Sequence, residues 1–279
     1  MIKGANNASL IFVLAYTIKD NKWGDDNSMN IKKIIITFII LSFIIISSIS
    51  EKSFFPESRE IKIISYNIHS GLDKNMYPTL FDIIDFLKMS DADIICLQEV
   101  NESAKVGFQV SSLKEELKMY SHFGANVVNF GSNYGLVTYS KYPIKSEKHI
   151  YLSSEREQRG LLHTVIDVNG KKLNVINVHL GVKKEEREIQ IKEVLDYAKS
   201  LGSEPYIVLG DFNEGSISLE GTNLKDAAEE TGNSNVLTFA LGLYRIDYIL
   251  VSSNIEVIDY NVQIKNMSDH YPILAKLKI

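Results

Sequence analysis

The chain has one cysteine and one tryptophan among its 279 residues. A lone cysteine cannot form a disulfide within the chain. Cys96 lies inside an apolar run, so it is predicted to be a small core residue. It is also far from the N-terminal segment, where a lipid-anchored cleavage site would need a cysteine. Trp23 lies near the N-terminus, and no exposed aromatic hairpin suited to entering a membrane is recognisable further along.

Positive charge is also scarce. The formal net charge is −5, and residues 1–59 hold seven of the 30 basic but only five of the 35 acidic residues, so the remainder stands at −7. Proteins that bind nucleic acid without sequence preference usually carry a basic face. No stripe of lysine and arginine is visible, which argues against a tight grip on a nucleic-acid backbone.

One long apolar run is present, from Ile34 to Ile46. Lys32 and Lys33 precede it and small serines follow it, which is typical of a secretory signal. Because crossing a bilayer takes about 20 apolar residues, the run is short for a membrane anchor. Cleavage before Glu51 is therefore the favoured interpretation, with an uncleaved signal anchor as the alternative. The protein is expected to be exported, either secreted or membrane-anchored and facing outside.

The position of this segment suggests how the chain divides. Met29 begins a complete signal sequence, so residues 1–28 are predicted to be a non-native or disordered extension, with a translation start at Met1 as the alternative. The chain then divides into a signal segment, a polar linker and one large domain: 29–50, 51–59 and 60–279. A hydrophobic content of 45% is enough for a sizeable core in that domain.

From Glu60 onward, short apolar runs alternate with helix-like segments. Runs such as Ile61 to Ile64 are typical of buried strands. Asn169-Gly170 between two such runs is the strongest two-residue signal for a hairpin turn. Amphipathic spacing predicts helices that start near Pro78 and cover 109–118, 183–200 and 224–230. This mixture predicts an α/β fold in which two packed sheets are flanked by helices.

Five short polar motifs follow the apolar runs in a fixed order. They are Ser65-Tyr66-Asn67, Leu97-Gln98-Glu99, Asn177-Val178-His179, Gly210-Asp211-Phe212-Asn213 and Ser268-Asp269-His270. Because the ends of neighbouring strands lie close together in a sheet, carboxylates, amides and imidazoles at five strand ends can converge on one point. That point is the predicted site.

Taken together, these motifs resemble those of the endonuclease/exonuclease/phosphatase superfamily, over about Ile61 to Leu277. The superfamily includes DNase I, abasic endonucleases, neutral sphingomyelinases and inositol-polyphosphate phosphatases. The resemblance implies a DNase I-like, four-layered α/β/β/α sandwich in which residues 60–279 form the catalytic domain. It also implies a metal-dependent hydrolase of phosphoric esters.

A metal site at Asn67, Glu99 and Asp269 is implied by the resemblance. A carboxylate is a hard oxygen ligand suited to Mg²⁺, for which Mn²⁺ can substitute. Glu99, expected at the end of its strand, resembles the residue that holds the metal. Asn67 adds a neutral amide, and Asp269 resembles an additional carboxylate on the metal side. Whether one or two ions act stays open.

The catalytic set implied by the resemblance is His179, Asp211, Asn213, Asp247 and His270. Asp211 resembles the residue that activates or positions the nucleophile, and Asn213 the donor that holds a phosphate oxygen or the attacking water. His270, backed by Asp247, resembles a general base. His179 resembles the general acid of the DNase I and sphingomyelinase branches. The implied reaction is in-line attack of water on phosphorus.

Two further residues are predicted to contact substrate. Arg159 matches an arginine often found before a strand, where a guanidinium can clamp a phosphate. A plain surface arginine is the alternative. His69 is next to the site through Asn67, and a supporting position behind it is as well founded as a substrate contact.

The substrate itself stays open. A nuclease-like phosphodiesterase is favoured, with a sphingomyelinase-like phosphodiesterase of membrane lipids or a small-molecule phosphatase as alternatives. A non-catalytic binding module is a remote alternative, because the motif set is intact. The expected partner is a phosphoester, either nucleic acid or a phospholipid head group. No obligate protein partner is evident, and the protein is expected to be a monomer.

Overall fold

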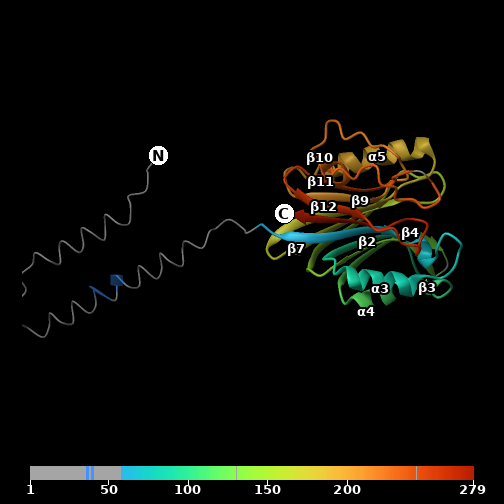
Figure 1. The fold of residues 1–279 in the computed structure, drawn as a ribbon, viewed down its shortest axis with the longest axis horizontal. Coiled ribbons are helices and arrows are strands. Elements are labelled where there is room, and N and C mark those ends of the chain that lie inside the picture. The colour runs from blue at the N-terminus through green and yellow to red at the C-terminus, as the bar shows by residue number, and fades with distance from the viewer. Residues whose placement is uncertain (1–35, 38, 41–57, 130, 243) are drawn as a thin grey trace, which may run out of the picture. The chain divides into compact units, whose positions relative to one another are not determined.

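The computed structural model describes residues 36–37, 39–40, 58–129, 131–242 and 244–279 (Figure 1). The predicted extension, and nearly all of the signal segment and linker, lie outside the described residues. Among the described helices, none is both long and apolar enough to cross a membrane. Glu57–Ile279 form one compact unit, and it contains every predicted site residue.

The compact unit contains two β-sheets. The strands of the first are β1 (Glu60–Asn67), β2 (Ile94–Ser103), β3 (Gly107–Phe108), β4 (Tyr120–Asn129), β5 (Ser132–Ser140), β12 (Glu256–Val262) and β13 (Ile273–Lys278). Their order is β12-β13-β1-β2-β5-β4, with β3 paired to β2. The strands of the second are β6 (Ile144–Tyr151), β7 (Gly160–Val168), β8 (Lys171–His179), β9 (Tyr206–Asp211), β10 (Leu224–Asp226) and β11 (Asp247–Ser252). Their order is β10-β11-β9-β8-β7-β6.

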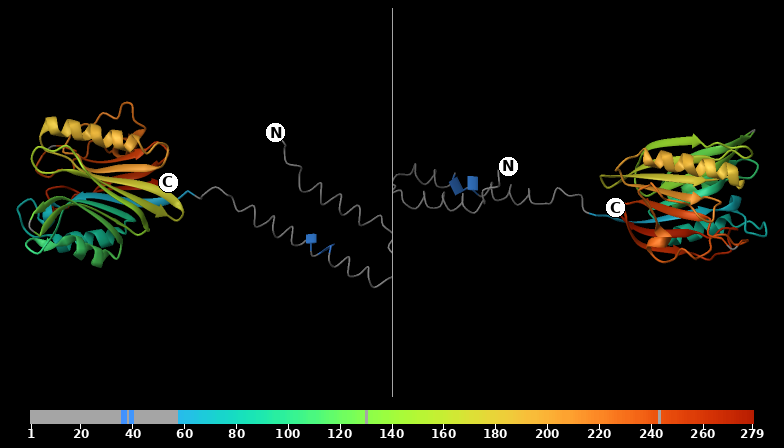
Figure 2. Two further views of the ribbon diagram at one scale, coloured as in Figure 1. Left: turned by 180° about the vertical axis from the view of Figure 1, so that it is seen from behind. Right: turned by 90° about the horizontal axis from the view of Figure 1, so that it is seen from above.

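The helices of this unit are η1 (His69–Gly71), α3 (Leu80–Ser90), α4 (Gln109–Leu117), α5 (Lys184–Lys199) and α6 (Ala227–Glu230). Helices α3, α4 and α5 cover the outer faces of the sheets, whereas η1 contacts β2 and α6 contacts β11 and β12, one strand from each sheet. Figures 1 and 2 show α3 and α4 beside the first sheet and α5 beside the second. The layers therefore run helix, sheet, sheet, helix, and the predicted α/β/β/α sandwich is confirmed.

Local signals explain several of these elements. α3 buries Ile83, Ile84 and Leu87 on one face, as its amphipathic spacing predicts. The β7–β8 hairpin turns at Asn169 and Gly170, whose φ angles are 53° and 91°. Two successive positive φ angles are what a tight hairpin turn requires, and this dipeptide supplies them at low cost.

One predicted helix is partly wrong. The segment 224–230 begins as strand β10, which pairs antiparallel with β11, and only Ala227–Glu230 are helical. Asp226 explains the change of structure because its side chain accepts a hydrogen bond from the backbone N–H of Ala228 at 2.9 Å. That contact caps the short helix at its first turn.

The residues between the sheets change from apolar to polar along each strand. Alternation along a strand places every second side chain on this inner face. The inner-face series are Ile61, Ile63, Ser65, Asn67 on β1; Leu173, Val175, Asn177, His179 on β8; and Ile207, Leu209, Asp211 on β9. The apolar core therefore fills one end of the sandwich and polar groups fill the other.

A buried hydrogen-bonded bridge joins the two sheets at this transition. Gln98 Nε2 donates to Asn177 Oδ1 at 2.7 Å. Asn177 Nδ2 in turn donates to the carbonyls of Leu97 and Val137, at 3.1 Å each. Gln98 and Asn177 are fully buried, so breaking this bridge would leave unpaired polar groups in the interior. The bridge fixes the spacing of the sheets directly beneath the polar end.

Candidate functional site

Elements from both sheets deliver side chains to the polar end of the sandwich. The contributors are Asn67 (β1), Glu99 (β2), His179 (β8), Asp211 (β9), Asp247 (β11) and His270, in the segment before β13. Ser268 fastens that last segment, since its hydroxyl donates to the backbone carbonyl of Asn67 at 2.8 Å. The predicted convergence of the motifs on one point is therefore present.

Glu99 reaches the site through a β-bulge, so the expectation that it ends its strand is wrong. β2 continues to Ser103, and its pairing with β5 shifts register between Leu97 and Val100. Glu99 itself has φ 58°, a left-handed conformation that is uncommon for a residue with a side chain. The bulge turns Glu99 toward the site although its neighbour Gln98 also faces inward.

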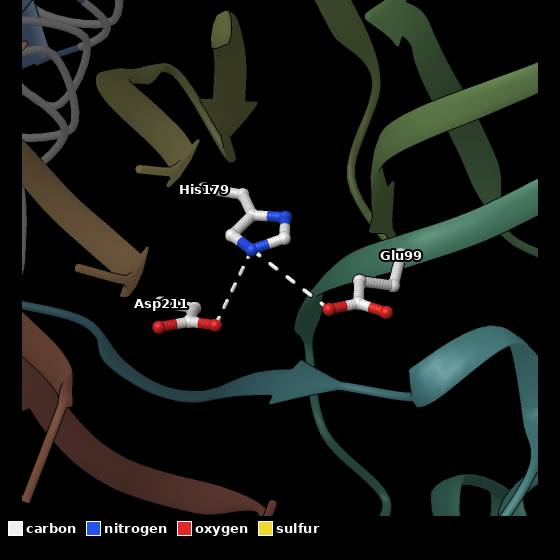
Figure 3. Close-up of side chains that lie close together, drawn as sticks. All are labelled: Glu99, His179 and Asp211. Atoms are coloured by element: carbon white, nitrogen blue, oxygen red, sulfur yellow. Dashed lines mark ion pairs between the residues drawn. The ribbon is translucent and has the colours of Figure 1, made fainter. Parts of the chain in front are cut away.

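Asn67 links the two carboxylates at the centre of the site. Its Nδ2 donates to Glu99 Oε1 at 2.9 Å and to Asp211 Oδ2 at 3.0 Å. His179 lies on the other side, with Nε2 3.4 Å from Asp211 Oδ2 and 3.8 Å from Glu99 Oε1 (Figure 3). Two carboxylates from opposite sheets are thus held side by side, with an imidazole facing both.

A second imidazole, that of His270 in the segment before β13, lies near Asp211. His270 Nδ1 lies 3.0 Å from Asp247 Oδ2, and His270 Nε2 lies 3.6 Å from Asp211 Oδ2. Phe239 supports this ring, with ring centroids 5.0 Å apart. The pairing of His270 with Asp247 that the resemblance implied is present in the structure.

Burial and neighbouring charge shift the pKa values of these groups. Burial raises the pKa of Asp211 to about 7, and Asp247 adds to that shift while His270 opposes it. Burial alone would lower the pKa of His270, but Asp247 and Asp211 together outweigh it and raise the pKa to about 10. Held between two carboxylates, His270 therefore keeps its proton.

His179 behaves in the opposite way. Burial, the Arg159 guanidinium and His270 together hold the pKa of His179 well below its usual range. Arg159 Nη1 lies 2.9 Å from His179 Nδ1 and 3.0 Å from Nε2, and 2.8 Å from Glu157 Oε1. The Arg159 side chain is only 10% exposed, so the alternative of a plain surface arginine is wrong.

The donor set fits a divalent cation. Ligand atoms of Glu99, His179 and Asp211 lie within 4.8 Å of one another, as do those of Asp211, Asp247 and His270. Asp211 belongs to both groups, and burial is the main cause of its raised pKa, so a nearby cation would stabilise its charged form. Carboxylate oxygens are the ligands that Mg²⁺ prefers, and imidazole broadens the choice to transition metals.

The remaining predicted residues lie at the edge of these groups. Asp269 is in neither of the two sets; its Oδ1 lies 3.7 Å from His69 Nδ1. The backbone N–H of His69 donates to Asn67 Oδ1 at 3.0 Å, so His69 stands directly behind Asn67. Asn213 donates from Nδ2 to the Leu180 carbonyl and from its backbone to Asp211 Oδ1, at 2.9 Å each. The roles of these three residues stay predictions.

Three residues near the site were not identified from the sequence. Tyr134 on β5 and Glu157 line a cavity beside Glu99, and Phe239 contacts His270. Burial, followed by the charges of Glu99 and Glu157, raises the pKa of Tyr134 above its usual range, so its hydroxyl keeps its proton. No motif or spacing marks these positions, because each becomes important only through a distant segment of the chain.

Comparison with known proteins matches residues 64–270 to the Endonuclease/Exonuclease/phosphatase family model. The uncharacterized protein YbhP of Escherichia coli (strain K12) is 32% identical over 168 residues, which are 55% of this chain and 66% of that protein. The match thus spans just under two thirds of the relative.

Solved structures share the fold. A crystal structure of an endonuclease/exonuclease/phosphatase from Beutenbergia cavernae has a TM-score of 0.71 at 20% identity, over 79% of this chain and 72% of that one. A mannosyl-6-phosphatase from Bacteroides thetaiotaomicron has a TM-score of 0.60 at 20% identity, over 78% and 99% of the two chains.

Proposed function

The chain belongs to the Endonuclease/Exonuclease/phosphatase family of metal-dependent phosphoester hydrolases, and from that premise we propose that it is an exported, Mg²⁺-dependent phosphodiesterase. One observation carries the proposal. Glu99, His179 and Asp211 come from three strands and place their ligand atoms within 4.8 Å of one another, and His270 with Asp247 adjoins them. This arrangement supplies cation ligands, a base and an acid around one point.

The cation would be held by the carboxylates of Glu99 and Asp211, with Asn67 aligning both. Asp269 is proposed as an additional carboxylate on the same side. A bound Mg²⁺ supplies positive charge against the negative charge that develops on the phosphoryl oxygens. Asn213 and Arg159 are proposed to contact the phosphate, which requires Arg159 to exchange part of its contact with Glu157.

The histidines act on protons. His270 takes the proton of the attacking water, and His179 donates one to the departing oxygen. The contacts within the protein alone favour the reverse proton distribution, because they raise the pKa of His270 and lower that of His179. Offsetting the charge of Asp211 lowers the pKa of His270, and a phosphate beside His179 raises the pKa of that ring. Both proposed roles therefore depend on a bound cation and a bound phosphoester.

Chelation tests the metal dependence. EDTA should abolish hydrolysis of bis(p-nitrophenyl) phosphate, and added Mg²⁺ should restore it. The Glu99→Ala variant should need a higher Mg²⁺ concentration or lose activity. Glu147→Ala is the matched control, because it removes an exposed carboxylate on β6. Unchanged turnover of Glu99→Ala at limiting Mg²⁺ would remove Glu99 from the proposed site.

The substrate class is proposed from charge. Nuclease-like activity remains the leading expectation within the family, yet a cavity beside Glu99 has no lysine or arginine among its described lining residues. That observation favours a second candidate, a small phosphoester, and a mannosyl-6-phosphatase shares this fold. Purified protein should be compared on plasmid DNA, RNA, sphingomyelin and sugar phosphates. A preference for plasmid DNA would reject the second candidate.

Export is proposed from the sequence between Lys32 and Ser50. β1 begins at Glu60, at the end of the strand opposite Asn67. Cell fractionation with N-terminal sequencing tests the proposal. A mature start near Glu51 indicates secretion and an intact membrane-bound chain indicates an anchor, whereas an intact soluble cytoplasmic chain contradicts both.

A further inference from the structure

A cavity of about 350 Å³ lies next to the site on the side of Glu99. Glu99 forms part of its wall, so a phosphoester held at Glu99 would extend one of its groups into this space. The other walls come from the segment after η1, from the β4–β5 hairpin and from Glu157. The cavity therefore faces a part of the substrate other than the reacting phosphate.

The cavity has two chemically different sides. Leu72, Met76 and Val127 contribute aliphatic surface. Asn129, Ser132, Tyr134 and Glu157 contribute an amide, two hydroxyls and a carboxylate. A ligand that fills this space needs both C–H surface and several hydroxyl groups.

The charges of the lining residues further limit which ligands fit the cavity. Glu99 and Glu157 are the charged members of the lining, and His69 is its only described residue that could carry a positive charge. The Glu157 side chain is 45% exposed, and it forms an ion pair with Arg159, which contacts His179. None of the described lining residues is a lysine or arginine that could pair with a second phosphate, and the nearby Arg159 guanidinium already contacts Glu157 and His179.

From these observations we propose that this cavity binds the uncharged, polyhydroxylated part of a phosphoester, such as a sugar or a cyclic polyol. The aliphatic side packs against the C–H face of the ring. Asn129, Ser132, Tyr134 and Glu157 exchange hydrogen bonds with its hydroxyl groups. This inference rests on the proposed function for the position of the phosphate, and it deepens that function by naming the substrate class.

Isothermal titration calorimetry on the purified full chain tests the proposal directly. Mg²⁺ is present throughout, and the titrated ligands are ethyl phosphate, glucose 6-phosphate and glucose 1,6-bisphosphate. We expect glucose 6-phosphate to bind at least about 10-fold tighter than ethyl phosphate, because the sugar adds several hydrogen bonds. The bisphosphate should bind more weakly than the monophosphate.

Two lysine substitutions sharpen the test. Ser132→Lys places a positive charge in the cavity wall and should reverse the preference, so that the bisphosphate binds more tightly than the monophosphate. Ser146→Lys adds the same charge on β6, where residue 146 is exposed and pairs with Val165, well along β7 from its start at Gly160. This control should leave the preference as it is in the unsubstituted protein.

The outcomes separate the two proposals when turnover of bis(p-nitrophenyl) phosphate is measured on the same preparation. Turnover without any gain from the sugar, or with tighter binding of the bisphosphate by the unsubstituted protein, overturns the cavity assignment alone. Sugar-dependent binding without turnover supports the cavity and overturns the hydrolase proposal. An equal change of preference in Ser132→Lys and Ser146→Lys would also count against the cavity.

Discussion

Two groups of histidines in this protein differ in their pKa values and in the residues around them. His179 and His270 belong to the site, whereas His122, His149 and His163 lie on β4, β6 and β7. Burial is shared, since four of the five are less than a tenth exposed and His149 is half-buried. What differs is the chemistry of the groups around each ring.

The second group has only neutral hydrogen-bond partners. The pairs are His122 with Thr164 at 2.8 Å, His149 with Asn126 at 2.8 Å, and His163 with Tyr197 at 2.9 Å and Asn174 at 3.1 Å. Burial lowers the pKa of all three, that of His122 to about 4. These rings therefore stay uncharged at neutral pH and act as polar core residues.

The site differs because it contains carboxylates. Burial acts to lower the pKa of both site histidines. At His270 the charges of Asp247 and Asp211 outweigh burial and raise the pKa, whereas at His179 the charges of Arg159 and His270 add to burial and the pKa stays low. Burial alone thus gives an inert histidine in both regions. The carboxylates of the site raise the pKa of one histidine and not of the other, so its two imidazoles differ in proton affinity.

The largest expected difference is in kcat, between the variants His270→Ala and His163→Gln. The first removes the proposed base and should lower kcat by at least about 10²-fold, the lower end of general acid–base contributions. The second alters only a neutral pair with Tyr197 and Asn174, and should change kcat by less than about 3-fold. Steady-state kinetics on bis(p-nitrophenyl) phosphate measures both.

Thermal melting of each variant serves as the folding control for that comparison. If the two substitutions reduced kcat equally while both variants melted as one folded population, the distinction between the two groups of histidines would be lost.

A smaller difference is expected within the site, from His179→Ala on two kinds of ester. An alkyl ester leaves as a strong base and needs a proton, so its hydrolysis should fall by at least about 10²-fold. A p-nitrophenyl ester leaves readily and should lose far less. The ratio of kcat values for the two substrates measures the acid role, and equal losses on both would contradict it.

The smallest effect concerns stability rather than catalysis. His122 takes up a proton near pH 6.5 when unfolded but only near 4 in the folded state, so the free energy of unfolding falls as the pH drops through this range. Below pH 4 the protonation of His122 lowers the free energy of unfolding by its full amount, which is about 2 kcal/mol after allowance for solvent screening. His122→Gln removes it and should flatten the pH profile.

Urea unfolding of the unsubstituted protein and His122→Gln at pH 7 and pH 4.5 measures this change. Other titrating groups are common to both proteins, so the difference between the two profiles isolates His122. Parallel profiles would show that His122 is already solvated in the folded protein.

Much of the fold followed from local patterns in the sequence. Short apolar runs located the strands that carry the motifs, and Asn169-Gly170 located the β7–β8 hairpin. Apolar runs ending in polar motifs indicated that Asn67, His179 and Asp211 would meet. These signals are readable because side-chain direction along a strand and φ preferences at a turn depend on a few adjacent residues.

Other features were decided only by tertiary structure. The bulge that turns Glu99 inward depends on the register of β2 against β5, and the burial of Arg159 depends on packing beside His179. Asn67 and Asp211 are 144 residues apart, yet their hydrogen bond aligns the site. Local preferences determined which residues stand at strand ends and turns. The orientation, pKa and pairing of those residues came from contacts between distant segments, since burial and neighbouring charge exist only in the folded chain.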